Sequence, residues 1–217
     1  MERMISFHGK QEIKDFYLNR VHQHVVNDEL IHGVYWEDGK GCGIGCTVHS
    51  GSHAAYEKEL GIPRILARLE DGIFESLSNG RSKLWPEQFL SAIEVGQDLS
   101  LVWPRFAVWL LTDKWHGVLQ YAKTQKSKIA IQNVADAYKS IVEGQKKEID
   151  WYKLRSADAA AAYAAAYADA AAAYAAAYAA AAADAAAYAA AADARFSKRQ
   201  EHREAQANKL LELLRAA

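Results

Sequence analysis

The chain has 217 residues and a nearly balanced charge, with 26 Lys and Arg against 27 Asp and Glu. This length suits one compact domain of ordinary size plus an extension. The charge lacks the basic excess of nucleic-acid-binding proteins, so we expect no nucleic-acid partner. Two cysteines are too few for a disulfide framework, and residues 1–10 lack an apolar run of signal-peptide length. We therefore expect a cytoplasmic protein with reduced thiols.

Residues 1–146 are expected to form a helical globular domain. Apolar residues recur at helical spacing, and proline and glycine mark where the helices begin and end. No segment alternates between apolar and polar residues for long, which predicts an all-α fold class. The expected helices cover residues 11–30, 63–77, 86–95 and 129–142, and residues 106–111 are apolar enough to lie in the core.

Glycines occur at six positions between residues 33 and 51, which predicts a loop or a tight hairpin within residues 33–53. This segment carries four residues of the types that bind zinc: Cys42, Cys46, His49 and His53. Thiolate and imidazole suit tetrahedral zinc. All four lie within 12 residues, however, which is tighter than the usual pairing of a knuckle with a helix.

The same loop allows three other interpretations. Cys42 or Cys46 followed by His116-Gly117-Val118 resembles the order of papain-type cysteine peptidases, but CGIGC departs from that family's CGSCW run. In an enzyme or metal site centred on this loop, we expect Glu57 or His116 to assist. A glycine-rich anion cradle with Lys40 as counter-charge is a second possibility. The simplest is a tight turn in which the cysteines pack as small hydrophobic residues and the glycines adopt positive φ.

Residues 147–217 are expected to form a long alanine-rich helix followed by an amphipathic charged tail. Residues 157–194 contain 29 Ala, five Tyr and four Asp, and the stretch ADAAAAYAAAY occurs twice in succession. An 11-residue repeat is three helical turns, so equivalent positions return to nearly the same face. The four Asp residues argue against insertion into a membrane. The repeat aligns a stripe formed by Tyr163, Tyr167, Tyr174, Tyr178 and Tyr188.

A tyrosine stripe on a helix with few other apolar residues favours burial against a partner. Our leading hypothesis is a non-enzymatic protein that binds a partner protein or a second copy of itself through this stripe. A spacer arm lengthened by repeat duplication is the alternative. The 11-residue alanine-rich pattern also resembles the single-helix fish antifreeze proteins, which implies ice binding, but those proteins carry Thr where this chain carries Tyr.

A wider resemblance covers nearly the whole chain. The run WEDGKGCGIGCTVHSGSHAAYEKELGIPRILARLEDGIFESL, followed by WPEQFL and DLSLVWPRFAVWLL, resembles a protein family of tailed phages, prophages and soil bacteria, with GKGCxxGC as its most distinctive part. The resemblance implies an accessory role in a mobile genetic element. It implies no activity, and no functional residues are carried over from it. The rival to partner binding is a zinc-binding protein or cysteine-dependent enzyme centred on residues 36–57.

Overall fold

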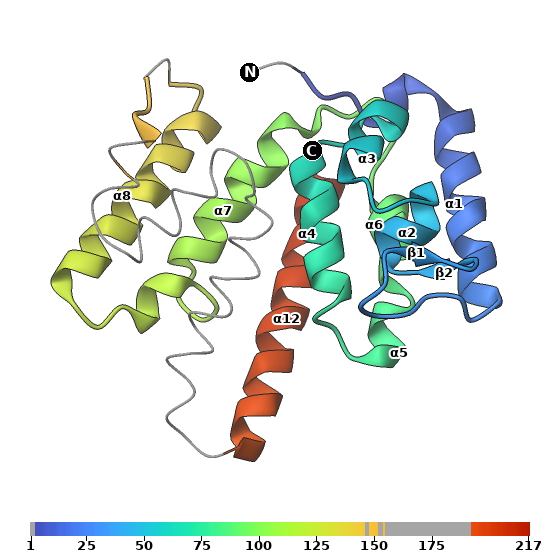
Figure 1. The fold of residues 1–217 in the computed structure, drawn as a ribbon. Coiled ribbons are helices and arrows are strands. Elements are labelled where there is room, and N and C mark those ends of the chain that lie inside the picture. The colour runs from blue at the N-terminus through green and yellow to red at the C-terminus, as the bar shows by residue number, and fades with distance from the viewer. Residues whose placement is uncertain (1–2, 146–147, 152–153, 155–191) are drawn as a thin grey trace. The chain divides into compact units, whose positions relative to one another are not determined.

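The computed structural model describes residues 3–145, 148–151, 154 and 192–217. These residues are mostly helical, which confirms the all-α class at that level (Figure 1). The predicted tyrosine stripe and its 11-residue repeat lie outside the described residues. In the described part of the chain, no helix is both long enough and apolar enough to cross a membrane.

The chain divides into two compact units. Unit 1 consists of Met1–Ser100 together with Ala207–Ala217, and unit 2 consists of Leu101–Gln206. The sequence predicts one domain boundary, after residue 146. In the structure the boundary follows Ser100 instead, and the last residues of the chain, Ala207–Ala217, belong to unit 1. The reason is that the apolar faces beyond residue 100 pack on each other and form their own core.

Unit 1 is built from short helices. Its elements are η1 (Ser6–Gly9), α1 (Gln11–Val26), β1 (Trp36–Glu37), β2 (Lys40–Gly41), α2 (Gly43–Val48), α3 (His53–Leu60), α4 (Arg64–Phe74), α5 (Asn79–Ser82) and α6 (Trp85–Ala92), with η2 (Leu99–Leu101) at the boundary. The helix α1 packs on α2 and α6, and α4 packs on α2, α3 and α6. Several helices therefore converge on α2, which lies in the loop that carries the two cysteines.

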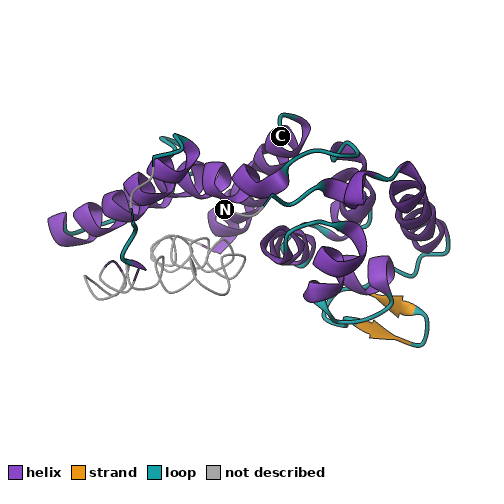
Figure 2. Cartoon of the chain, turned by 90° about the horizontal axis from the view of Figure 1, so that it is seen from above, coloured by secondary structure: helices purple, strands orange, loops and turns teal. Residues whose placement is uncertain are grey.

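The predicted hairpin is present as the antiparallel pair β1 and β2, with Trp36 opposite Gly41 (Figure 2). The helix α2 directly after it was not expected from the sequence. The predicted helices at residues 63–77 and 86–95 correspond to α4 and α6. Pro63 precedes α4, and Pro86 occupies the first turn of α6, where its fixed φ is favourable.

The core of unit 1 is formed by large side chains without solvent exposure. One face of α4 is apolar at helical spacing, with Leu66, Leu69 and Ile73 buried. The end of the chain adds Leu210 and Leu214 to the buried set. The largest fully buried side chains of unit 1 include Phe7, Ile44, Tyr56, Phe74, Trp85 and Phe89.

Unit 2 contains α7 (Val102–Thr112), η3 (Val118–Tyr121), α8 (Gln125–Val142) and the first part of α12 (Ala192–Arg215). The helices α7 and α8 pack side by side (Figure 1). The side chain of Thr124 caps α8 by accepting a hydrogen bond from the Ser127 N–H. The expectation that residues 106–111 are core and that 129–142 form a helical face is confirmed. The core consists of Ala107, Leu111, Ile131, Val134, Ala135 and Tyr138.

Candidate metal centre

Three glycines of the loop allow close contact between α2 and its surroundings. A Cβ atom on Gly41 or Gly45 would lie 2.0 Å or 1.4 Å from the carbonyl oxygen of Tyr35. A Cβ on Gly43 would lie 2.2 Å from Oε1 of Glu70. None of these three glycines has a positive φ. They are present because neighbouring backbone and a carboxyl group leave no room for a side chain. The positive φ expected of the loop glycines is found at Gly33 and Gly39.

Cys42, Asp71 and Glu75 form a cluster, which we call the CDE cluster. One ligand atom of each residue lies within 4.8 Å of the others. Asp71 and Glu75 are four residues apart along α4 and its C-terminal cap, so they share one face of the helix. Cys42 is the residue before α2 and is fully buried, whereas Glu75 is exposed. The cluster therefore runs from the interior of unit 1 to its surface.

The carboxyl group of Glu70 lies beside this cluster and is fully buried. Neither of its oxygens has a hydrogen-bond partner in the described residues. Burial, together with the nearby carboxylates of Asp71 and Glu75, raises the pKa of Glu70 well above its usual value. An unpartnered carboxyl group in a protein interior is costly, so this one requires an explanation.

Two side chains orient Asp71 within the cluster. The Nε2 atom of His53 lies 3.0 Å from Oδ2 of Asp71, and the Tyr35 hydroxyl donates to the same oxygen at 3.3 Å. Both contacts use Oδ2, so Oδ1 is occupied by neither. Glu75 is held separately, because the N–H of Gly33 donates to both of its carboxyl oxygens at 3.1 Å. The carboxyl groups are thus held by Gly33 and Tyr35 of the loop that precedes the hairpin and by His53 at the start of α3.

Both thiols are held in their protonated form. Burial is the main cause that raises the pKa of Cys42 far above the usual thiol value, with the carboxylates of Asp71 and Glu70 adding to it. Burial also raises the pKa of Cys46 to about 12. A nucleophilic cysteine needs a lowered pKa, so these environments do not activate either thiol.

The four zinc ligands expected from the sequence do not converge. Cys42 belongs to the CDE cluster, and His53 contacts it through Asp71. The thiol of Cys46 points elsewhere and donates to the carbonyl oxygen of Gly41 at 3.4 Å. His49 lies against His24, with 2.9 Å between their Nε2 atoms. Cys42, Cys46 and His49 are close in sequence but point to different places, because Cys42 precedes α2, Cys46 lies within it and His49 caps its C-terminus.

His116, the expected catalytic partner of Cys42, belongs to unit 2, whereas Cys42 belongs to unit 1. Its Nδ1 atom lies 3.2 Å from Nδ1 of His202, whose Nε2 atom lies 2.8 Å from the Tyr121 hydroxyl. The segment after His116 forms the short helix η3. Glu57, the other assisting residue, lies 3.7 Å from the guanidinium of Arg64 and is not part of the CDE cluster.

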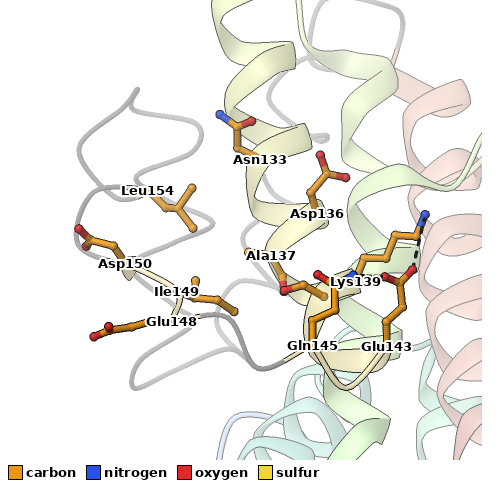
Figure 3. A pocket seen from close by; sticks show the side chains of 11 residues that line it. Asn133, Asp136, Ala137, Lys139, Glu143, Gln145, Glu148, Ile149, Asp150 and Leu154 are labelled. Atoms are coloured by element: carbon orange, nitrogen blue, oxygen red, sulfur yellow. Dashed lines mark hydrogen bonds and ion pairs between the residues drawn. The ribbon is translucent and has the colours of Figure 1, made fainter.

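A hollow of about 740 Å³ lies in unit 2 beside α8. Figure 3 shows that most of the side chains labelled around it are of polar residue types and that Lys139 and Glu143 form an ion pair on one side of it. No group of three potential metal ligands occurs there within the described residues. The residues that line it include Asn133, Asp136, Lys139, Glu143, Gln145, Glu148 and Asp150. Its open, solvated walls make it a weaker candidate than the CDE cluster.

Comparison with models of protein families, with curated proteins and with solved structures finds no match to this chain. The site must therefore be judged by its own chemistry.

Sequence reasoning identified Cys42 but missed both carboxylates of the cluster and Glu70. One feature of the sequence could have pointed to Glu70. Glu70 lies four residues after Leu66 and three before Ile73, so it is on the apolar face of its helix. A carboxylate in that position is rarely buried without a partner. That anomaly points to the part of α4 on which the site is built.

Proposed function

We propose that the protein binds a divalent transition-metal ion of the zinc type, and that Cys42, Asp71 and Glu75 are its ligands. The observation that carries the proposal is the convergence of a thiol and two carboxyl groups beside the fully buried, unpartnered carboxyl of Glu70. Zinc binds thiolate sulfur at about 2.3 Å and carboxylate oxygen at about 2.0–2.2 Å, so neighbouring ligand atoms of a tetrahedral ion lie about 3.4–3.6 Å apart. The ligand atoms of the CDE cluster lie within 4.8 Å of one another, so the side chains would close by about 1 Å when an ion binds.

The charge of the site supports a cation. Four acidic groups lie together here. Beyond the effect of burial, the Asp71 carboxylate raises the pKa of both Cys42 and Glu70, and Glu75 adds to the rise at Glu70, because like charges disfavour ionisation. A bound cation reverses this relation, since it lowers the pKa of a coordinating thiol until the thiolate forms. Cys42 would then bind as a thiolate, and Glu70 would face a positive charge instead of other carboxylates.

The remaining groups of the site match the surroundings of a metal ligand. Carboxylates that bind metals are usually themselves hydrogen-bonded, which fixes their orientation. His53 and Tyr35 do this for Asp71, and the backbone N–H of Gly33 does it for Glu75. Three protein ligands leave one position of a tetrahedral ion open. Because Glu75 is exposed, we expect that position to be near solvent, where water or a small anionic ligand could reach it.

Isothermal titration calorimetry with Zn²⁺ tests the proposal. We expect one equivalent to bind to the wild-type protein, and binding to weaken at least about tenfold in Asp71→Asn and in Glu75→Gln, because each change removes an anionic ligand. Glu57→Gln is the matched control, since Glu57 is an acidic residue of the same unit that lies outside the cluster. Equal affinities in all four proteins, or no binding to the wild type, would exclude the proposal.

The prediction that the tyrosine stripe binds a partner or a second copy is independent of this proposal. It concerns residues outside the described part of the chain, and it stays a prediction.

A further inference from the structure

We propose that His24 and His49 form an acid-triggered switch, in which a second proton on the pair drives the two rings apart and uncovers the indole ring of Trp36. His24 lies on α1, and His49 is the C-terminal cap of α2. Their Nε2 atoms lie 2.9 Å apart and their ring centroids 5.1 Å apart, so the rings point head-on at each other and share one N–H···N hydrogen bond. The helices α1 and α2 pack on each other, so this bond joins two elements of unit 1.

The contact between the two nitrogens allows only one proton between them. An imidazole nitrogen donates a hydrogen bond when it carries a proton and accepts one when it does not. If both Nε2 atoms carried protons, N–H bonds of about 1 Å would leave the two hydrogens only about 1 Å apart. Two positively charged rings would also face each other. The pair must therefore separate when both rings are protonated.

The first proton is accommodated by Glu29. Its Oε2 atom lies 2.6 Å from Nδ1 of His24, and the His24 side chain is largely buried. A protonated His24 donates from Nδ1 to this carboxylate and from Nε2 to a neutral His49, so the hydrogen bond between the rings is kept. The negative charge of Glu29 balances the positive ring, which a buried position requires. The first proton thus leaves the pair closed.

A second proton, on His49, has no such balance. The Nη1 atom of Arg20 donates to the carbonyl oxygen of Thr47 at 3.0 Å, which places a guanidinium near this end of α2. Partial burial lowers the pKa of His49, and the charges of Arg20 and His24 lower it further. Glu29 acts in the opposite direction, but its carboxylate is already engaged by His24. Protonation of His49 is therefore disfavoured in the closed pair.

His49 is the ring that moves when the pair opens. It is exposed, and its Nδ1 atom has no hydrogen-bond partner among the described residues. Its remaining ring contact is a stack on Trp36, with centroids 4.3 Å apart and an interplanar angle of 13°. Trp36 belongs to β1, so departure of His49 uncovers one face of an indole in the hairpin. The ring of His24 stays edge-on to Trp36, because its own anchor at Glu29 is unchanged.

The direction of the pH dependence follows from these contacts. The open form leaves His49 in water, where its pKa returns to about 6.5, whereas the closed form holds it lower. The open form therefore binds more protons, and its population rises as the pH falls below 6.5. One proton taken up on opening changes the ratio of open to closed molecules by up to about tenfold for each pH unit in that window. Above pH 6.5 the closed form is favoured.

Nuclear magnetic resonance of the wild-type protein between pH 7.5 and 4.5 tests the switch without any metal. The indole N–H signal of Trp36, assigned with Trp36→Phe, is expected to shift with a midpoint below pH 6.5. The imidazole C–H signals of His49 should titrate at the same midpoint, because one proton drives both changes. An indole signal that stays constant over this range, or that changes with a midpoint above 6.5, overturns the proposal.

His49→Asn tests whether this histidine is the trigger. Asparagine tolerates the positive φ of 51° at this cap but does not take up a proton at acid pH, so the Trp36 signal should become independent of pH. His22→Asn is the matched control: His22 is an exposed histidine on the same helix, and the Trp36 titration should persist. A titration that persists in folded His49→Asn, or that disappears in both variants, contradicts the proposal. If His49→Asn does not fold, the two midpoints in the wild-type protein decide.

Discussion

The substitution Gly45→Ala is predicted to destabilise unit 1 strongly. The new methyl carbon would lie 1.4 Å from the carbonyl oxygen of Tyr35, whereas such contacts essentially never fall below 3.0 Å. The helix α2 and the segment that contains Tyr35 would have to separate by at least about 1.6 Å, the difference between those two distances. The atom in the way belongs to the backbone, so no side-chain rotation can relieve the overlap.

The expected cost follows from what that separation breaks. Overpacking a tight interior costs about 1–3 kcal/mol. The backbone hydrogen bond from the Cys42 N–H to Val34, 2.7 Å long, lies in the same contact, and its loss adds about 0.5–1.5 kcal/mol. The sum, about 1.5–4.5 kcal/mol, is a large share of the roughly 5–15 kcal/mol that stabilises an ordinary domain.

Urea unfolding followed by far-ultraviolet circular dichroism measures this effect. Gly80→Ala is the matched control, because Gly80 lies in the short helix α5, has no positive φ, and an added Cβ there meets nothing within 4 Å. That change is expected to be neutral or to stabilise the protein by about 0.4–1 kcal/mol. The explanation of the loop glycines is refuted if both variants unfold within about 0.5 kcal/mol of the wild type.

Two further predictions concern other parts of the fold. Leu111→Ala should destabilise the protein by about 2–4 kcal/mol, because Leu111 is buried in the core of unit 2. Ile129→Ala, on the exposed face of α8, should change the free energy of unfolding by less than about 0.5 kcal/mol. Comparable losses of stability for both variants in urea unfolding would contradict this assignment of the core. Burial and the Glu59 carboxylate raise the pKa of Tyr17 to about 12, so the folded protein keeps a proton between pH 10 and 12 that the unfolded chain releases. Stability should therefore fall with rising pH in that window, and Tyr17→Phe should remove part of the fall; identical alkaline unfolding profiles would show that this contact has no such effect.

The helices of this protein were largely predictable from local signals, but the site was not. Proline and apolar spacing located α4 and α6 because these signals act within one or two turns of chain. The link between Cys42 and Asp71 spans 29 residues and depends on how α2 packs on α4, which no local pattern encodes. The loop glycines were visible in the sequence. The reason for them was not, because it is a set of contacts formed on folding: Tyr35 lies against Gly41 and Gly45, and Glu70 lies against Gly43.

The two cysteines show why spacing in the sequence did not reveal which side chains lie together. Cys42 and Cys46 are four residues apart and equally suited to zinc in the sequence. In the structure, Cys42 precedes α2 and is close to two carboxyl groups, whereas Cys46 lies within the helix and donates to a backbone carbonyl. The division of the chain into units was hidden for a similar reason, since an apolar helix face does not reveal which other face will cover it.

Titration with Co²⁺, followed by absorption spectroscopy, tests the metal-site proposal most directly, because a thiolate ligand gives Co²⁺ an intense near-ultraviolet charge-transfer band. We predict that this band develops in the wild-type protein and in Cys46→Ser, and that it is lost in Cys42→Ser, in which the sulfur of the CDE cluster is replaced. A band that survives in Cys42→Ser, or that disappears equally in both variants, would contradict the account.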